Sequence, residues 1–379
     1  MVNMKFSFTE EQDEFRSVLR RFLEDKSPST EVRRLMATVD GWEREQWAKI
    51  NSELALTAVA IPEAYGGHGF GLSEQCIVLE EMGRSLLCAP YFGSAVLAAS
   101  AILYAGTEEQ KNELLPGIAS GGTVATLAFT EENGSWDNSG LTTIFDKSKD
   151  EYSITGTKSF VLDGTTADLI IVLARTPNTK KDEGLSLFAV DGQASGLKKE
   201  PLKSVDETRK LARIHFDQVP AKLLGVEGNA AGPMKKTMTR SIICLANEMV
   251  GGADRLREDA LEYVKMRMQF GRSIASFQVT KHKATDMLAD VELAKSAAYF
   301  AAAAFDEEDD ETEEAASIAK AASSEAYMQT AIHSIQMHGG IGFTWDNDTH
   351  LWFKRAKSSE VFLGDPAHHH EKMMTIWDA

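Results

Sequence analysis

The chain has 379 residues, of which 43% are hydrophobic and 26% charged, so it can bury a large core and is long enough for two or three domains. Its net charge of −17 argues against non-specific nucleic-acid binding, which needs a basic surface. The three cysteines lie far apart and match no metal or disulfide pattern, no signal-peptide apolar region follows the N-terminus, and no apolar run is long enough to span a membrane. These features predict a cytoplasmic protein without a metal site.

The first segment, residues 1–122, is predicted to be helical. Thr9 and Gln12 have the spacing of a capping box, and the apolar residues behind them recur on one face of a helix. Further helical patterns lie at residues 41–54, 72–87 and 107–121. The sequence YGGHGFG at 65–71 contains Gly-x-Gly, but no β-strand precedes it and no βαβ unit follows it. We therefore interpret it as a turn and not as a dinucleotide-binding loop.

The texture changes near Thr123. Short runs rich in β-branched and aromatic residues, TVATLAF, DEYSITGTKSFVL, ADLIIVLAR, LSLFAV and ARIHFDQV, are separated by turn residues with no helices between them. This spacing predicts an antiparallel β-barrel or β-sandwich in the middle segment, residues 123–224.

The last segment, residues 225–379, returns to long helical patterns. We predict helices over 232–267, 277–305 and 313–338, with an acidic loop between the last two and a glycine stop at Gly339 and Gly340. The whole chain is therefore predicted to be α+β, with an N-terminal helical domain, a middle β-domain and a C-terminal helical bundle.

Five motifs, in this order along the chain, resemble the acyl-CoA dehydrogenase family. They are IPEAYGGHGFG, GTEEQKNELLPGIASG, AFTEENGSWD, RMQFGRSIASFQ and QMHGGIGFTW. The resemblance covers nearly the whole chain. It implies an FAD-dependent flavoprotein oxidoreductase that introduces an α,β-double bond into an acyl-CoA thioester, and that passes electrons to an electron-transferring flavoprotein. Substrates from fatty acid or steroid side-chain β-oxidation both remain open.

The resemblance implies that several residues hold FAD. Arg267, Phe270 and Gln278 match family positions that contact the pyrophosphate and adenine end of the cofactor, and Gln336, Gly339 and Gly340 match a second such position. In the family these groups reach the flavin of a neighbouring subunit, so an oligomer is implied. Without the resemblance, Arg267 would be interpreted as a cation at a helix C-terminus and Phe270 as a core ring.

Other matches concern the flavin bound by the same subunit. Thr130 matches a contact to the pyrimidine side of the ring, Ser135 a contact to pyrophosphate or substrate, and Phe160 an aromatic ring against the flavin face. Read without the resemblance, this region is a polar turn that leaves a strand. Leu162 departs from the pattern, because a threonine that hydrogen-bonds flavin N5 is common there.

The usual catalytic base is missing. Leu363 stands where most family members carry the glutamate that removes the α-proton, and the second family position for a base falls on Ser241 or, with a two-residue slip, on Thr239. Glu248, in an apolar helical run, is the remaining candidate base, although it could instead pair with an arginine or lie exposed. The His368–His370 run follows an N-cap and points in several directions around a helix, so a metal site is not expected there.

These losses lead to one main hypothesis and three alternatives. The chain keeps residues that serve a neighbour's FAD but has altered those of its own site, so we expect one subunit of a heterotetramer with a similar second subunit. The alternatives are a self-sufficient homotetramer that uses Glu248, a catalytically silent assembly subunit, and an oxidase or monooxygenase of the same fold.

Overall fold

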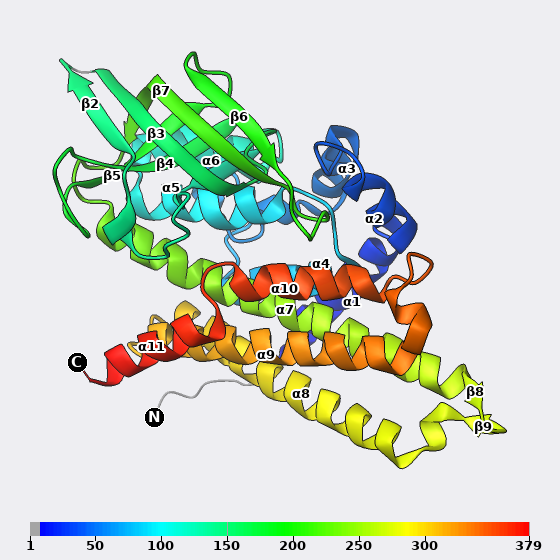
Figure 1. The fold of residues 1–379 in the computed structure, drawn as a ribbon. Helices are drawn as coiled ribbons and strands as arrows, with labels where there is room; N and C mark the ends of the chain where they lie inside the picture. Colours follow the sequence, from blue (N-terminus) through cyan, green and yellow to red (C-terminus); the bar gives the residue numbers. More distant parts are fainter. Residues whose placement is uncertain (1–7, 150, 379) are drawn as a thin grey trace. The chain divides into compact units, whose positions relative to one another are not determined.

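The computed structural model describes residues 8–149 and 151–378 (Figure 1). The chain forms two compact units that interleave along the sequence: Met1–Arg33, Leu72–Leu87 and Ile242–Ala379 make the first, and Arg34–Gly71 and Cys88–Ser241 the second. The first unit is helical and the second contains the β-domain. The predicted N-terminal segment therefore contributes to both units, and its boundary as a domain stays a prediction.

Long helices build the helical unit. The predicted capping box is confirmed at the start of the first helix, where the Thr9 side chain accepts from Gln12 N and the Gln12 side chain from Thr9 N. The three predicted C-terminal helices are also confirmed, each within a residue at either end, and α2 and α7 extend into both units. The helices are α1 (Glu10–Lys26), α2 (Ser29–Met36), α4 (Leu72–Ser85), α7 (Ala231–Met266), α8 (Gln278–Asp306), α9 (Thr312–His338), η6 (Gly339–Phe343), α10 (Thr349–Val361) and α11 (Pro366–Trp377).

A closed sheet forms the core of the second unit, as Figure 1 shows. Strand β5 pairs with both β4 and β7, β7 pairs with β3, β3 with β2, and β2 touches β4, so the strand order returns to its start. Side chains inside this barrel form one apolar core. The strands are β1 (Ala125–Ala128), β2 (Ile144–Ser148), β3 (Glu151–Leu162), β4 (Leu169–Arg175), β5 (Leu185–Asp191), β6 (Leu197–Leu202) and β7 (Leu211–Leu224).

The barrel differs from the predicted pattern in two respects. Strand β1 pairs with β4 in parallel, which is possible because β2 and β3 form the long connection that a parallel pair requires. Strands β2 and β6 lack a clear apolar pattern because their side chains are largely exposed or half-buried, and the sequence did not predict them. The helices of this unit are α3 (Arg44–Leu54), α5 (Ala99–Ala105), α6 (Glu108–Ala119) and the short η1 (Leu56–Ala58), η2 (Glu63–Tyr65), η3 (Phe92–Ala98) and η4 (Asn138–Gly140).

A buried lysine closes the end of α10. Lys320, on α9, is fully buried, and its Nζ donates to the carbonyls of Glu360 and Gly364 at 3.1 and 2.8 Å and to Ser324 Oγ at 3.0 Å. Glu360 O belongs to the last turn of α10 and Gly364 O to the loop behind it, and carbonyls in the last turn of a helix have no partner within the helix. Burial lowers the pKa of Lys320 to about 7, against the attraction of Glu360 and Asp365.

We predict that Lys320 makes folding stability depend on pH. The unfolded chain holds this proton up to a pH of about 10.5, whereas the fold releases it near 7, so the unfolded state binds more protons between these values. The cost of burying the charge is therefore full below pH 7 and declines as the pH rises. Lys320→Met should lack this rise, which is on the order of a few kcal/mol, in urea unfolding measured across that range.

Lys49→Met is the matched control, because its ammonium group is largely exposed and pairs with Glu45 on the surface. It should unfold with the pH dependence of the wild type. The same pH dependence in wild type and Lys320→Met would show that Lys320 does not titrate in the fold.

Candidate functional site

A β-hairpin joins α7 to α8 and carries the first group of predicted FAD contacts. Its strands β8 (Met268–Gln269) and β9 (Arg272–Ser273) pair in antiparallel register, and Ile274 N closes the hairpin by donating to Arg267 O at 2.9 Å. The Ser273 hydroxyl donates to the Val264 and Lys265 carbonyls at 2.8 and 3.0 Å, which fastens the hairpin to the last turn of α7. The hairpin therefore has a fixed origin at the helix end.

The tip of this hairpin presents an aromatic ring to the outside. Phe270 and Gly271 form the two-residue turn, and both have positive φ, 52° and 75°, as a type I′ turn requires. A phenylalanine in this conformation is unusual, because its Cβ is crowded there and glycine or asparagine fits better. Phe270 is nevertheless 91% exposed, and its ring packs nearly perpendicular to that of Phe277, with ring centres 6.2 Å apart. Phe270 is therefore an exposed ring on a strained turn, and the alternative interpretation as a core ring is wrong.

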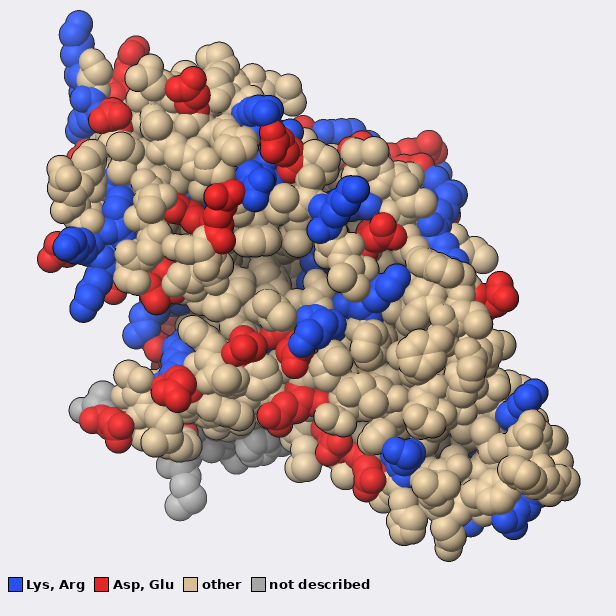
Figure 2. Space-filling view, viewed as in Figure 1, with Lys and Arg blue, Asp and Glu red and all other residues tan. Residues whose placement is uncertain are grey.

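Arg267 and Gln278 flank the hairpin and are also exposed. Within residues 8–149 and 151–378, neither side chain has a hydrogen-bond or ion-pair partner. The surface around them is largely uncharged, with scattered basic side chains, at the end of the helical unit that carries the hairpin in Figures 1 and 2. The exposed apolar side chains of this region are Met266, Met268, Val279, Ile341, Phe343 and Trp345.

The turn after α9 carries the second group. Gln336 is exposed on the last turn of α9, and Gly339, with φ of 66°, and Gly340 start the short helix η6. A Cβ added to either glycine would meet no atom within 4 Å, so the space beside this backbone is open. Bare peptide groups beside open space allow a phosphate to approach the main chain. The two groups of predicted contacts thus lie on one helical unit, and all of them are accessible.

The barrel unit carries the third group. Thr130 is buried, and its hydroxyl donates to Ser159 O at 2.6 Å, so only its lone pairs remain for a ligand. Ser135 is half-buried in the turn that follows and accepts from Asp137 N at 3.3 Å. Phe160 is 43% exposed and has a φ of 60° within a register shift of β3 against β7. A second exposed phenylalanine therefore has left-handed backbone geometry.

An ion pair that the sequence did not reveal holds the Thr130–Ser135 segment. Lys158, with no exposed surface, donates to Glu131 Oε1 at 3.0 Å, and Glu131 also accepts from the amides and hydroxyls of Thr142 and Thr143. Burial raises the pKa of Glu131, but Lys158 and these donors outweigh it and hold that pKa below its usual value. The sequence did carry one signal of a buried ion pair: Lys158 occupies a position of β3 that points into the protein.

The positions of the missing family groups are filled by buried leucines. Leu162 and Leu363 are 2% and 3% exposed. Leu363 has a φ of 61° in the loop between α10 and α11, and its carbonyl accepts from His369 Nε2 at 3.0 Å. The loop therefore keeps a fixed shape around a side chain that cannot accept a proton. His369 is buried and neutral, because burial lowers its pKa to about 3.

Glu248 is neither exposed nor isolated. Its Oε1 accepts from Arg355 Nη1 at 2.7 Å, and both side chains are about 95% buried between α7 and α10. Gly83, on α4, lies so close to the Glu248 backbone that a Cβ there would fall 2.0 Å from the Glu248 carbonyl oxygen. Glu248 thus pairs with an arginine, which was one alternative to its role as the base. Ser241 and Thr239 donate to the carbonyls of Thr237 and Lys235 within α7.

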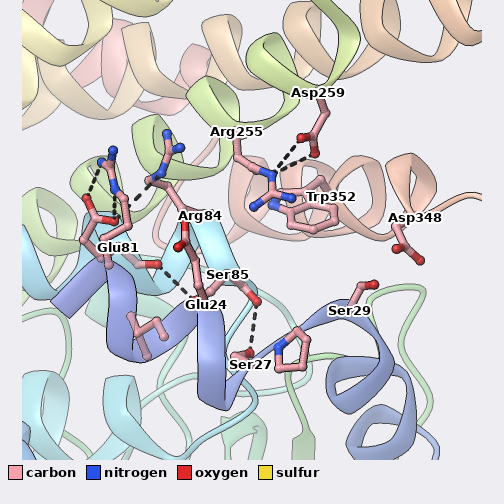
Figure 3. A pocket seen from close by; sticks show the side chains of 13 residues that line it. Glu24, Ser27, Ser29, Glu81, Arg84, Ser85, Arg255, Asp259, Asp348 and Trp352 are labelled. Atoms are coloured by element: carbon pink, nitrogen blue, oxygen red, sulfur yellow. Dashed lines mark hydrogen bonds and ion pairs between the residues drawn. The ribbon is translucent and has the colours of Figure 1, made fainter. Parts of the chain in front are cut away.

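The helical unit also contains a polar pocket of about 390 Å³, drawn in Figure 3. Arg20, Arg84 and Arg255 line it, but Glu81, Glu258 and Asp259 already accept from them, and none of the predicted site residues lines it. In the part of the chain that the structure describes, no three His, Cys, Asp or Glu side chains are grouped to hold a metal ion. No helix among these residues is long and apolar enough to cross a bilayer.

Comparison with known proteins places these features in one family. Residues 9–122, 126–219 and 232–374 match the N-terminal, middle and C-terminal domains of acyl-CoA dehydrogenases. An acryloyl-CoA reductase (NADH) of Anaerotignum propionicum is 30% identical over 96% of this chain and 93% of its own.

Two solved structures share the fold across their whole length. Butyryl-CoA dehydrogenase from Megasphaera elsdenii has a TM-score of 0.93 and 26% identity, covering 99% of this chain and 100% of its own. A chain of the ChsE4–ChsE5 complex from Mycobacterium tuberculosis has a TM-score of 0.89 and 25% identity, covering 99% of both chains. The predicted order of a helical domain, a β-domain and a helical bundle is confirmed. The chain belongs to the acyl-CoA dehydrogenase family, whose members are FAD-dependent oxidoreductases that act on CH–CH bonds.

Proposed function

We propose that this chain is one subunit of a two-component acyl-CoA dehydrogenase, in which it holds the FAD of a neighbouring, similar subunit. Its contacts to that FAD are Arg267, Phe270, Gln278, Gln336, Gly339 and Gly340, and its own proton-abstracting position is occupied by Leu363. The observation that carries the proposal is the contrast between these two sets. The six proposed FAD contacts are exposed, whereas Leu363 is buried and has no atom that can accept a proton.

The exposed set fits a dinucleotide. A guanidinium binds phosphate oxygens through paired N–H groups, and glycine backbone lets phosphate reach the amides. The Phe270 ring supplies a flat apolar surface of the kind that packs along an adenosine. The positive φ of Phe270 costs conformational free energy, and burial of the exposed ring does not offset this cost in a free surface turn. A ligand that covers the ring would offset it.

Thr130, Ser135 and Phe160 would contact flavin from the barrel unit. Thr130 offers only acceptor capacity, because its proton is used by Ser159, and this suits an N–H of the flavin pyrimidine. Phe160 would lie against the ring system. When bound, FAD accepts the hydride that leaves the β-carbon of the acyl group. The chain's own part in the reaction is to hold and orient the cofactor.

Removal of the α-proton needs a base, and this chain offers a poor one. Leucine has no basic atom, and the hydroxyls of Ser241 and Thr239 are donors within α7. Glu248 has its carboxylate on the buried Arg355, away from water. The proposal therefore places the base on the second subunit. A complex of two named components, ChsE4–ChsE5, exists among the similar structures, which supports an assembly of this kind.

We further propose that the substrate is an acyl-CoA thioester and that an electron-transferring flavoprotein reoxidises the flavin. Both follow from membership of the family and not from a contact within this chain. An oxidase or monooxygenase would use oxygen instead. Oxygen consumption without an added electron carrier separates these possibilities.

We predict that Arg267→Ala lowers FAD binding while the fold is retained, because Arg267 is exposed and its side chain makes no contact that the fold needs. Loss of a charge-assisted contact to phosphate should weaken FAD binding by about tenfold or more. Flavin content per protein, read from the absorption spectrum of the variant co-expressed with the similar second subunit, measures it. Arg272→Ala is the matched control, because Arg272 lies on the same hairpin but rests on Phe277 with 4.0 Å between guanidinium carbon and ring centre.

A second prediction concerns assembly. Expressed alone, the chain should purify with little flavin, and acyl-CoA added without oxygen should not bleach it. Co-expression with a similar subunit should give a stable yellow tetramer whose flavin is bleached. A fully flavinated, active homotetramer of this chain alone would refute the two-component proposal.

The third prediction tests the role of Glu248. Arg355→Met leaves the buried Glu248 carboxylate without its guanidinium partner and should lower the free energy of unfolding by roughly 3–5 kcal/mol. Glu248→Leu combined with Arg355→Met removes both charges and should be less destabilised than the single variant. Denaturant unfolding of the three proteins measures both effects.

A flavin-bleaching experiment tests whether Glu248 instead has a catalytic role. If Glu248→Gln retained FAD but could no longer be bleached by acyl-CoA, Glu248 would be the base of a self-sufficient enzyme. Bleaching that survives in Glu248→Gln would leave it as a structural partner of Arg355.

A further inference from the structure

The two exposed groups that face the proposed nucleotide lie on different helices. The hairpin with Arg267 and Phe270 leaves the C-terminal end of α7, whereas Gly339 and Gly340 follow the C-terminal end of α9. A dinucleotide bound by both groups at once needs them at a fixed separation. A ring contact joins the two helix ends directly: the rings of Tyr263, on α7, and His338, on α9, are stacked with centres 4.4 Å apart and planes 26° from parallel.

Each ring is tied to one of the two groups. Tyr263 O accepts from Arg267 N at 2.9 Å, so Tyr263 lies one helical turn before the arginine on the same strip of α7. His338 immediately precedes Gly339, and a Cβ on Gly342 would lie 3.0 Å from His338 Cβ, so the turn packs closely on the histidine. Each ring therefore stands on backbone within one helical turn of the proposed contacts.

The histidine ring has a defined orientation. Its Nδ1 lies 2.8 Å from Ser334 O, and because a carbonyl can only accept, Nδ1 carries a proton. His338 is 8% exposed and directly follows Met337, which forms a small apolar cluster with Ala260, Val264 and Met287, and Tyr263 packs against this cluster. The stack is thus anchored on both sides and is not a surface contact made by chance.

We propose that Tyr263 and His338 are positioning residues that hold the α7 hairpin and the α9 turn at the separation needed to bind one dinucleotide. This inference rests on the proposed function, because it assumes that both elements face the same FAD. The stack would preorganise the site, because two elements fixed in advance lose less conformational entropy on binding than two that must be brought together. Neither ring needs to touch the cofactor.

The test measures FAD binding by the full-length chain in the assembly that retains flavin. After removal of FAD, the cofactor is titrated back, and the dissociation constant is obtained from flavin fluorescence. We expect Tyr263→Ala to bind FAD about five- to tenfold more weakly, which is the upper part of the range for an aromatic pair. Tyr263→Phe, which keeps the ring, should stay within about twofold of the wild type. His338→Ala and His338→Phe should behave in the same two ways.

Rescue by the phenylalanine variants separates positioning from general stability. If Tyr263→Ala fails to fold, Tyr263→Leu is the second variant, because it fills the apolar cluster without a stacking ring and should also bind FAD weakly. Wild-type FAD affinity in a folded Tyr263→Leu or Tyr263→Ala protein would overturn the inference.

Arg267→Ala, measured in the same titration, distinguishes the two levels of proposal. Weak binding by Arg267→Ala with normal binding by the Tyr263 and His338 variants would overturn only the positioning role. Normal binding by Arg267→Ala would instead remove the proposed FAD surface itself. Non-additive losses in Tyr263→Ala combined with Arg267→Ala would support one coupled site.

Discussion

A buried network of ion pairs fixes the packing of the helical unit, and the candidate surface depends on it. Arg84 on α4 donates to Asp254 and Glu258 on α7, Lys295 on α8 joins the same Asp254, and α1 joins the network through Arg16 and Arg20. Burial raises the pKa of Asp254, but Lys295 and Arg257 outweigh it and hold it below its usual value. Removing one member would leave buried charge uncompensated, so these helices keep one arrangement. The hairpin connects α7 to α8, so the packing of these two helices sets its position.

Exposed aromatic residues in left-handed conformation distinguish the candidate site from the rest of the fold. Phe270 and Phe160 each combine positive φ with an accessible ring, one in each compact unit. Elsewhere positive φ occurs at polar side chains, such as Lys149 and Asn178, and at buried leucines, such as Leu86 and Leu363. An exposed phenylalanine under such strain gains little from burial, and the proposed FAD contacts would account for each ring.

Backbone contacts, and not the side chain of Leu363, shape the loop between α10 and α11. Lys320 and His369 hold its carbonyls, and Gly364, with φ of 101°, completes its shape. None of these contacts uses the side chain at position 363. The hydrogen bonds that shape this loop are therefore made to backbone carbonyls and do not depend on a polar side chain at position 363. This independence is compatible with the proposed division of cofactor binding and proton removal between two subunits.

The sequence by itself determined the fold class, the long C-terminal helices, the capping box of α1 and the motifs that identify the family, because periodicity, capping and glycine stops are local signals. It also proposed Arg267, Phe270 and Gly339 as contacts, and these assignments stay predictions. Only the tertiary structure decided that Glu248 pairs with Arg355, that Lys158 pairs with Glu131 and that Tyr263 stacks on His338. Each pair joins residues far apart along the chain, and no local pattern specifies the partner of a buried charge or ring. Strands β2 and β6 were missed for a related reason: their exposed side chains leave only backbone pairing with neighbouring strands to define them.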